Sequence, residues 1–209
     1  MTIWTSPTLR GEQVLLRPLG AQDTNDLWTD VQDPEGRRLT GTHHVFTYKD
    51  IADDRASRAD KTDRITLAVT SVDSAVYRGE VVLMDHDEAN RSASLRIGLA
   101  PDAHGQGLGV EALRLVRAHA FGPLALHRVS LEVFDFNAQA IHAYEKIGFR
   151  HEGRMRDALW WDGAPHGNSA HGHLGNGMGG LEMSEENKMT YQRWTHTFAG
   201  TARIWVERQ

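Results

Sequence analysis

The stretch that decides the fold is His104-Gly105-Gln106-Gly107-Leu108-Gly109-Val110-Glu111-Ala112. An apolar run typical of a strand, residues 92–99, precedes it, and an amphipathic run typical of a helix, residues 110–121, follows it. Glycines let backbone N–H groups converge without obstruction from side chains, and a helix N-terminus adds partial positive charge. The stretch therefore predicts a site for an anion such as a pyrophosphate.

On the N-terminal side of this stretch the hydrophobic pattern predicts strands and two helices. The helices begin at Asp23, ending before Pro34, and at Asp50, running to Arg58. The strands are expected at residues 11–19, 65–71, 78–84 and 92–99. Because the turns between the last three strands are short, we expect these strands to be antiparallel neighbours.

On the C-terminal side the pattern predicts a strand at 128–134, a helix from Asn137 to Lys146 and a strand at 149–155. Asn137 is the expected N-cap, and Gly148 ends the helix. A strand–helix–strand crossover joins the strands at 92–99 and 128–134, so these two should be near-parallel. The fold class is thus a mixed α/β (α+β) one.

The composition of the chain excludes several kinds of functional site and partner. The chain has 209 residues, no cysteine, and 23 Lys+Arg against 28 Asp+Glu, a net charge of −5. This excludes a disulfide framework, a thiolate metal site and a cysteine nucleophile, and it disfavours a nucleic-acid partner. The first seven residues resemble no targeting signal, and no apolar run could span a membrane. We therefore expect a cytoplasmic protein without a membrane partner.

Three interpretations of the glycine stretch compete with each other. A Walker P-loop is excluded because Val110 and Glu111 follow Gly109, where lysine and serine or threonine are required. A dinucleotide fingerprint, as in a nucleotide-cofactor oxidoreductase, fits Gly107 to Ala112, but its acidic residue is only roughly matched by Glu132. A tight packing turn without any ligand also remains open.

A second motif decides among them, because together the two resemble the GNAT superfamily of N-acetyltransferases. The acetyl-CoA loop of that family, Arg/Gln-x-x-Gly-x-Gly/Ala, is similar to residues 104–109, with His104 in the first position. The family's Asn-x-x-Ala-x-x-x-Tyr and Gly-Phe follow 28 residues after Gly109, as Asn137, Ala140, Tyr144 and Gly148-Phe149. Residues 131–133 and 156–163 look like the branch that includes ribosomal-protein-alanine N-terminal acetyltransferases.

The resemblance covers residues 9–163 and implies a GNAT-like architecture. We expect a central mixed, mostly antiparallel sheet, with a V-shaped split between two near-parallel strands and flanking helices. Residues 1–162 would form the acetyltransferase domain. Residues 163–180, with seven glycines, are predicted to be a Gly/His-rich flexible loop. Residues 181–209 form an atypical C-terminal segment, which either supplies the last strand at 202–206 or leaves it missing.

The resemblance also implies a reaction, the direct transfer of an acetyl group from acetyl-CoA to a primary amine. The acceptor would be a protein N-terminus or a small amine. The alternative is a non-catalytic acyl-CoA-binding or partner-binding module of the same fold. No metal is expected, and a homodimer is left open. The residues expected to contact acetyl-CoA are Ile97, Leu99, His104, Gly105, Gln106, Gly107, Leu108, Gly109, Val110, Asn137 and Ala140.

Two residues are predicted to be catalytic. Tyr144 stands where the family keeps its acid, and a phenol of pKa ~10 can protonate a departing thiolate of pKa ~8.5. Glu132 is the predicted base, directly or through water, since an N-terminal amine of pKa ~8 needs only a modest one. The structural alternatives are a helix-face aromatic for Tyr144 and a solvent-facing strand residue for Glu132.

The remaining features are less specific. His166, His171 and His173 could hold a metal, but a solvated loop fits their glycine-rich surroundings better. His43, His44 and Trp28 either line the acceptor site or lie on the surface.

Overall fold

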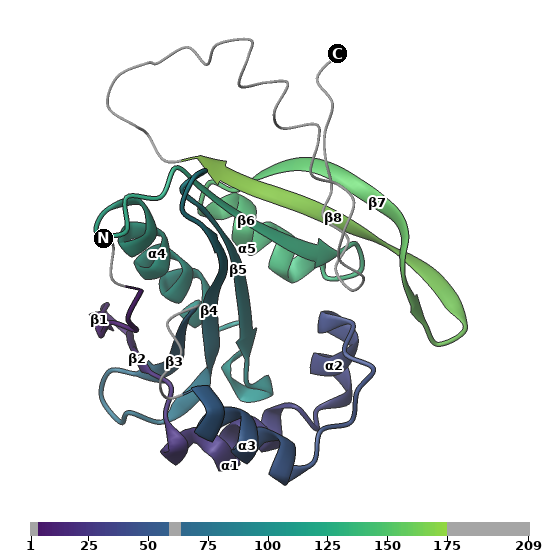
Figure 1. Cartoon of the computed structure of the whole chain (residues 1–209). Coiled ribbons are helices and arrows are strands. Elements are labelled where there is room, and N and C mark those ends of the chain that lie inside the picture. Colours follow the sequence, from purple (N-terminus) through teal and green to yellow (C-terminus); the bar gives the residue numbers. More distant parts are fainter. Residues whose placement is uncertain (1–3, 59–63, 175–209) are drawn as a thin grey trace.

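The computed structural model describes residues 4–58 and 64–174, and these form one twisted sheet with helices on both faces (Figure 1). The sheet order is β1-β2-β3-β4-β5-β6-β8-β7, and every neighbouring pair is antiparallel except β5 with β6. The strands are β1 (Leu9–Arg10), β2 (Val14–Pro18), β3 (Ile65–Ser71), β4 (Tyr77–Asp87), β5 (Ser92–Leu99), β6 (Arg128–Phe134), β7 (Arg150–Trp161) and β8 (Ala164–Leu174). The helices are α1 (Thr24–Asp30), α2 (Pro34–Thr40), α3 (Tyr48–Arg58), α4 (Leu108–Phe121) and α5 (Ala138–Lys146), with short 3-10 turns at Ala21–Asp23 and Pro101–Ala103.

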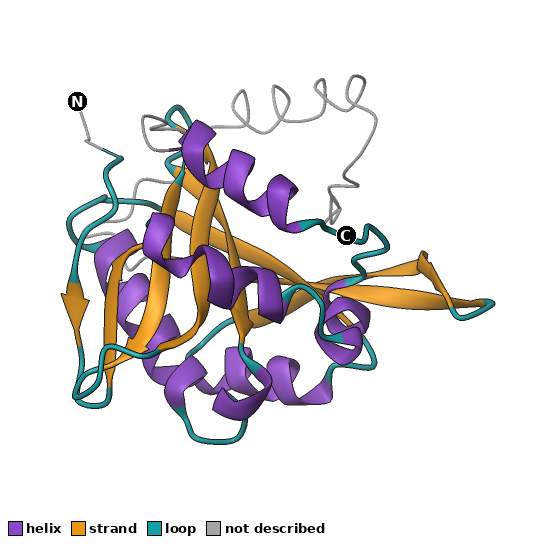
Figure 2. Ribbon diagram, turned by 90° about the horizontal axis from the view of Figure 1, so that it is seen from below, coloured by secondary structure: helices purple, strands orange, loops and turns teal. Residues whose placement is uncertain are grey.

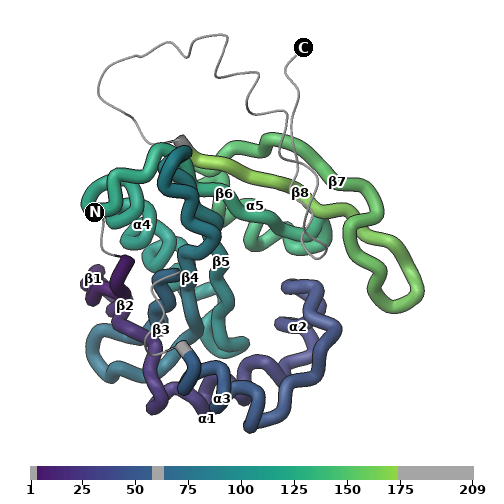
Figure 3. Tube along the Cα trace, viewed as in Figure 1, coloured from purple at the N-terminus to yellow at the C-terminus, as the bar shows by residue number. Residues whose placement is uncertain are grey.

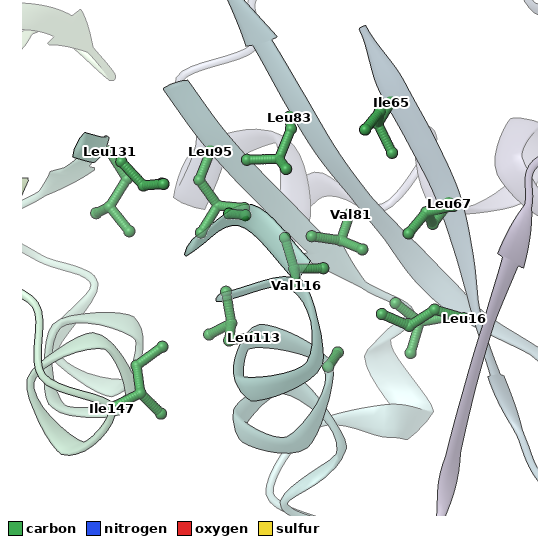
Figure 4. Close-up of a cluster of buried hydrophobic side chains, with 14 of the residues drawn as sticks. Leu16, Ile65, Leu67, Val81, Leu83, Leu95, Leu113, Val116, Leu131 and Ile147 are labelled. Carbon is green, nitrogen blue, oxygen red and sulfur yellow. The ribbon is translucent and has the colours of Figure 1, made fainter. Parts of the chain in front are cut away.

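The core lies between α4 and one face of the sheet (Figure 4). Helix α4 buries a stripe that includes Leu113 and Val116, and these side chains face Leu16, Val81 and Leu95 from the strands. Burial of this stripe positions the N-terminus of α4 against the end of β5. The packing therefore orients the glycine stretch that opens the helix.

The predicted split between two near-parallel strands is confirmed. β5 and β6 pair in parallel only where Ser92, Ala93 and Ser94 face Arg128, Val129 and Ser130. Beyond these residues the strands continue without pairing to each other, and Figures 1 and 3 show them diverging. We call the unpaired segments, residues 95–99 of β5 and 131–134 of β6, the split.

Most predicted elements occur at or near their expected bounds. β3, β5 and β6 coincide with the predicted ranges, and Asn137 caps α5 by accepting a hydrogen bond from the Ala140 N–H at 3.1 Å. Helix α2 was not expected, because Pro34 was interpreted as the end of a helix. Pro34 instead occupies the first turn of α2, and Asp33 caps that helix by accepting from the Gly36 N–H at 2.6 Å.

The prediction of a flexible loop from Gly163 is wrong for residues 164–174. These residues form β8, which lies between β6 and β7 and is hydrogen-bonded to both. A short turn at Asp162-Gly163 therefore leads directly from β7 into β8, with no inserted loop. Residues 175–180 and the strand predicted at 202–206 lie outside the described residues.

Ion pairs explain the two glycines of this strand, Gly167 and Gly172. Arg128 of β6 pairs with Glu152 of β7, with Nη1 to Oε1 at 2.7 Å. The pair crosses β8 at Gly172, where an added Cβ would lie 2.3 Å from the Glu152 carboxylate. The ion pair between Asp135 and Arg154 crosses β8 at Gly167 in the same way. Glycine thus leaves room for ion pairs that join the strands on either side of β8.

Gly79 on β4 is required by a close approach of two backbones. Its φ is +142°, and an added Cβ would lie 2.2 Å from the Gly98 carbonyl oxygen and 2.7 Å from the Leu99 Cα. Gly79→Ala is therefore expected to lower the free energy of unfolding by about 3 kcal/mol or more. Urea unfolding measures this loss. Gly98→Ala is the matched control, because nothing lies within 4 Å of its added Cβ; equal losses in both variants would contradict the explanation.

No helix among the described residues has both the length and the apolar character needed to cross a bilayer.

Candidate active site

The glycine loop, residues 104–109, joins β5 to α4 through two left-handed glycines. Gly105 has φ +73° and Gly107, the N-cap residue of α4, has φ +83°. No atom lies within 4 Å of a Cβ added at either residue, so the space in front of both backbones is open. Gly109 is different, because a Cβ there would lie 3.0 Å from the Leu99 side chain. A glycine at this position lets α4 approach the end of β5.

The backbone N–H groups of this loop have no acceptor among the described residues. In the described part of the chain, no hydrogen bond is donated by the N–H groups of residues 105–110, whereas the next N–H, from Glu111, is bonded to the Gly107 carbonyl at 3.1 Å. Three of these groups belong to the first turn of α4, where the helix dipole favours negative charge. A run of free donors beside open space fits the diphosphate of a coenzyme A molecule.

The edge of β5 that faces the split also has free backbone groups. Ala100 donates its N–H to the Arg78 carbonyl of β4 at 2.9 Å. Because backbone N–H groups alternate between the two edges of a strand, those of Leu99 and Ile97 point toward the split. Both residues were predicted to contact acetyl-CoA, and this edge could pair with an extended ligand.

His104 and Gln106 direct their side chains to the backbone of the preceding turn. His104 Nε2 lies 3.1 Å from the Leu99 carbonyl oxygen, and Gln106 donates to the Asp102 carbonyl. The side chain of Leu108 is buried, whereas Val110 is half-buried against the core. The loop therefore offers a ligand mainly backbone donors.

Tyr144 of α5 lies in the core. Its side chain is 7% exposed and its ring centroid lies 6.1 Å from that of Phe149. It shares a buried cluster with Leu95 of β5 and Leu131 of β6. Burial raises the pKa of Tyr144 to about 12, so its phenol remains protonated at neutral pH.

Glu132 lies on the opposite face of β6. Val129, Leu131 and Val133 point into the core, as predicted, and Glu132 alternates with them and is exposed. Its Oε2 accepts a hydrogen bond from Asn168 Nδ2 of β8 at 2.8 Å. Tyr144 therefore lies on the core face of the sheet and Glu132 on the opposite face.

Asn168 was missed because it falls in the segment interpreted as a loop. The seven glycines of residues 163–180 predicted a flexible loop, so no pattern in that segment pointed to Asn168. The predicted contacts Asn137 and Ala140 lie in the first turn of α5, where the Asn137 side chain caps the helix.

Helix α2 and the β7–β8 hairpin meet beside the far end of the split. Gly41, which ends α2 with φ +64°, is packed so closely that an added Cβ would lie 2.6 Å from the Phe134 ring. His43 stacks on Trp161 with centroids 4.8 Å apart. Figure 2 shows the hairpin extending beyond the rest of the sheet. His43 is thus next to the hairpin, whereas Trp28 packs against Tyr48 of α3 at 6.0 Å.

The interpretation of His171 as part of a solvated loop is wrong. Its side chain is 1% exposed, on the core face of β8 opposite Leu131. Neither ring nitrogen has a hydrogen-bond partner among the described residues. Within those same residues, no three His, Asp or Glu side chains gather in a way that could hold a metal ion.

Burial, together with nearby His151, lowers the pKa of His171 below its ordinary value of 6.5, while Glu145 and Glu152 raise it slightly. Below pH 6.5 the unfolded chain therefore binds a proton that the folded chain does not, and the free energy of unfolding falls. In His171→Leu, the loss of melting temperature between about pH 7.5 and about pH 5.5 should be smaller than in the unmodified protein. His127→Gln, an exposed control, should keep the full loss; an unchanged loss in His171→Leu would contradict the assignment.

Comparisons with known proteins agree with this geometry. Residues 13–150 match the family model described as an acetyltransferase (GNAT) domain. The prophage-derived uncharacterised N-acetyltransferase YokL of Bacillus subtilis is 25% identical over 164 residues, which are 78% of this chain and 88% of the relative. The spermidine N(1)-acetyltransferase of Escherichia coli is 33% identical over 85 residues, or 41% of this chain and 46% of that enzyme.

A solved structure shows the same fold. The spermidine N-acetyltransferase of Vibrio cholerae, in complex with CoA and spermine, superimposes with a TM-score of 0.73 over 78% of this chain and 96% of that one, at 21% identity. The likeness is one of fold, and it includes the mixed sheet described above. Since the family model spans well over half of the sequence, the chain belongs to the GNAT acetyltransferase family and is an N-acetyltransferase.

Proposed function

We propose that this protein transfers the acetyl group of acetyl-CoA directly to the primary amine of a small molecule. The observation that carries the proposal is the run of free N–H donors at residues 105–110 beside a split in the sheet. Two of the relatives named above are spermidine acetyltransferases, which supports a small amine as the acceptor.

The glycine loop would hold the diphosphate of the coenzyme. Its donors are backbone groups at the N-terminus of α4, so they can bind an anion without a basic surface. This agrees with a net charge of −5 for the whole chain. The free edge of β5 at Ile97 would pair with the extended arm of the coenzyme.

The N–H of Leu99 would polarise the thioester carbonyl. It points into the split, at the end of β5 next to the glycine loop. A fixed N–H donor stabilises the negative charge that develops on a carbonyl oxygen under attack. The chain would thus supply the electrophilic assistance from its backbone.

Tyr144 and Glu132 would move the two protons of the reaction. Tyr144, which is protonated at neutral pH, gives its proton to the departing sulfur. Glu132, on the other face of β6, takes the proton that the amine loses, directly or through a water molecule. Their placement on opposite faces of the sheet keeps the acid and the base apart.

The test is a CoA-release assay with acetyl-CoA and a panel of acceptors. The panel contains spermidine, a monoamine, and a peptide with N-terminal alanine. Amine-dependent release of CoA with the small amines is the expected result. Release only with the peptide would overturn the small-amine assignment. Binding of acetyl-CoA without turnover of any amine would overturn the proposed reaction.

A further inference from the structure

Asn168 of β8 makes one hydrogen bond whose purpose the fold alone does not explain. Its side chain is 5% exposed, and its Nδ2 donates to Glu132 Oε2 at 2.8 Å. The amide orientation follows from chemistry, because an ionised carboxylate only accepts hydrogen bonds. The other amide atom, Oδ1, is buried and has no partner among the described residues.

This arrangement is unfavourable for stability. A buried carbonyl oxygen without a donor loses its hydration and gains nothing in return, and native proteins rarely keep such a group without a reason. Glu132 is exposed and could be hydrated by water in the absence of Asn168. Among the described residues, the bond to Glu132 is the hydrogen bond that the buried amide makes. The reason for a polar residue at this position therefore lies with Glu132.

The sheet holds Asn168 at a defined place beside the split. Asn168 lies opposite Phe134 of β6, and Ala170 lies opposite Glu132, so Asn168 and Glu132 are diagonal neighbours. β8 is hydrogen-bonded to β6 on one side and to β7 on the other. A side chain on an interior strand is oriented more precisely than one on a loop.

We propose that Asn168 is a positioning residue that orients the Glu132 carboxylate toward the acceptor amine. This inference rests on the proposed function. In the reaction one N–C bond forms and the C–S bond breaks. The amine proton passes to Glu132, and the departing sulfur receives the proton of Tyr144. Asn168 touches neither reacting atom; its N–H favours the ionised carboxylate and restricts its rotation.

The test uses Asn168→Leu, which removes the hydrogen bond and the unpartnered oxygen with little change in shape. The kcat should fall about tenfold, which is less than the factor of about 10²–10⁴ that a general base supplies as a whole. The KM for acetyl-CoA should not change. The acid limb of the pH–rate profile should move up by about one pH unit. The melting temperature should be unchanged or higher, whereas a purely structural role predicts a lower one.

Ser169→Ala is the matched control. Ser169 is the next residue of β8, is 7% exposed, and donates to Asp135 at 2.8 Å. Its loss removes a similar buried bond that does not involve Glu132, so kcat should not change. Asn168→Asp keeps the shape if the leucine variant fails to fold. It places a second carboxylate beside Glu132, and the acid limb should move up further.

A double-mutant cycle distinguishes failure of the positioning role of Asn168 from failure of the proposed function. In a Glu132→Gln background, Asn168→Leu should have almost no further effect on kcat, because both changes disable the same group. A full tenfold loss in that background would overturn the inference. The inference would also be overturned if Glu132→Gln lowers kcat while Asn168→Leu leaves kcat unchanged. No turnover by the unmodified protein with any amine would instead overturn the proposed function.

Discussion

Tyr144→Phe is expected to lower kcat by about 10²-fold or more, while the KM for acetyl-CoA stays nearly unchanged. The substitution removes the phenol proton and keeps the ring that packs against Phe149. Burial raises the pKa of Tyr144 to about 12, so the phenol is protonated across the neutral range, as an ordinary tyrosine also is. Steady-state kinetics at saturating acetyl-CoA measure the loss.

Tyr48→Phe is the control for this substitution, because Tyr48 is 48% exposed on α3 and lies outside the proposed machinery. It should leave both kinetic constants unchanged. Circular dichroism and thermal melting should show that Tyr144→Phe remains folded. Full turnover by a folded Tyr144→Phe enzyme would show that another group protonates the sulfur.

Gly107→Val should weaken acetyl-CoA binding by about 10²-fold or more. A β-branched residue at φ +83° is a strained outlier, with a cost of about 1–3 kcal/mol. The loop would relieve this strain by changing its conformation, and the N–H groups of residues 105–110 would no longer converge. The new side chain would also enter the open space where the diphosphate is proposed to lie. Isothermal titration calorimetry gives the dissociation constant directly.

The chain offers a matched control for this experiment. Gly163, in the β7–β8 turn, has φ +77°, and nothing lies within 4 Å of an added Cβ. Gly163→Val thus introduces similar backbone strain in equally open surroundings, away from the glycine loop. Its affinity for acetyl-CoA should be that of the unmodified protein. Equal affinities in the two valine variants would contradict the binding role of the loop.

The sequence pattern correctly predicted those parts of the fold that depend on residues close together in the sequence. The alternation in β6 placed Val129 and Leu131 in the core and Glu132 outside it, as the structure confirms. The Asn137 cap was likewise predictable, because a cap depends on residues within one turn. The parallel pairing of β5 and β6 followed from the crossover between them.

The errors arose where distant residues decide the local structure. The glycines of β8 were interpreted as flexible, yet Gly172 leaves room for a pair between Arg128 and Glu152, which are 24 residues apart. Nothing within β8 itself reveals those partners. Pro34 was ambiguous in a different way, because proline both ends helices and begins them. Asn168 could be recognised only once β8 was placed beside β6.

Acetyl-CoA is expected to bind with its diphosphate on the glycine loop and its thioester at the end of β5. The most direct measurement is an NMR titration of the ¹⁵N-labelled protein with acetyl-CoA. The largest shifts of backbone N–H resonances should occur at residues 105–110 and at Leu99. Binding that leaves these resonances unmoved, while others elsewhere on the sheet shift, would contradict it.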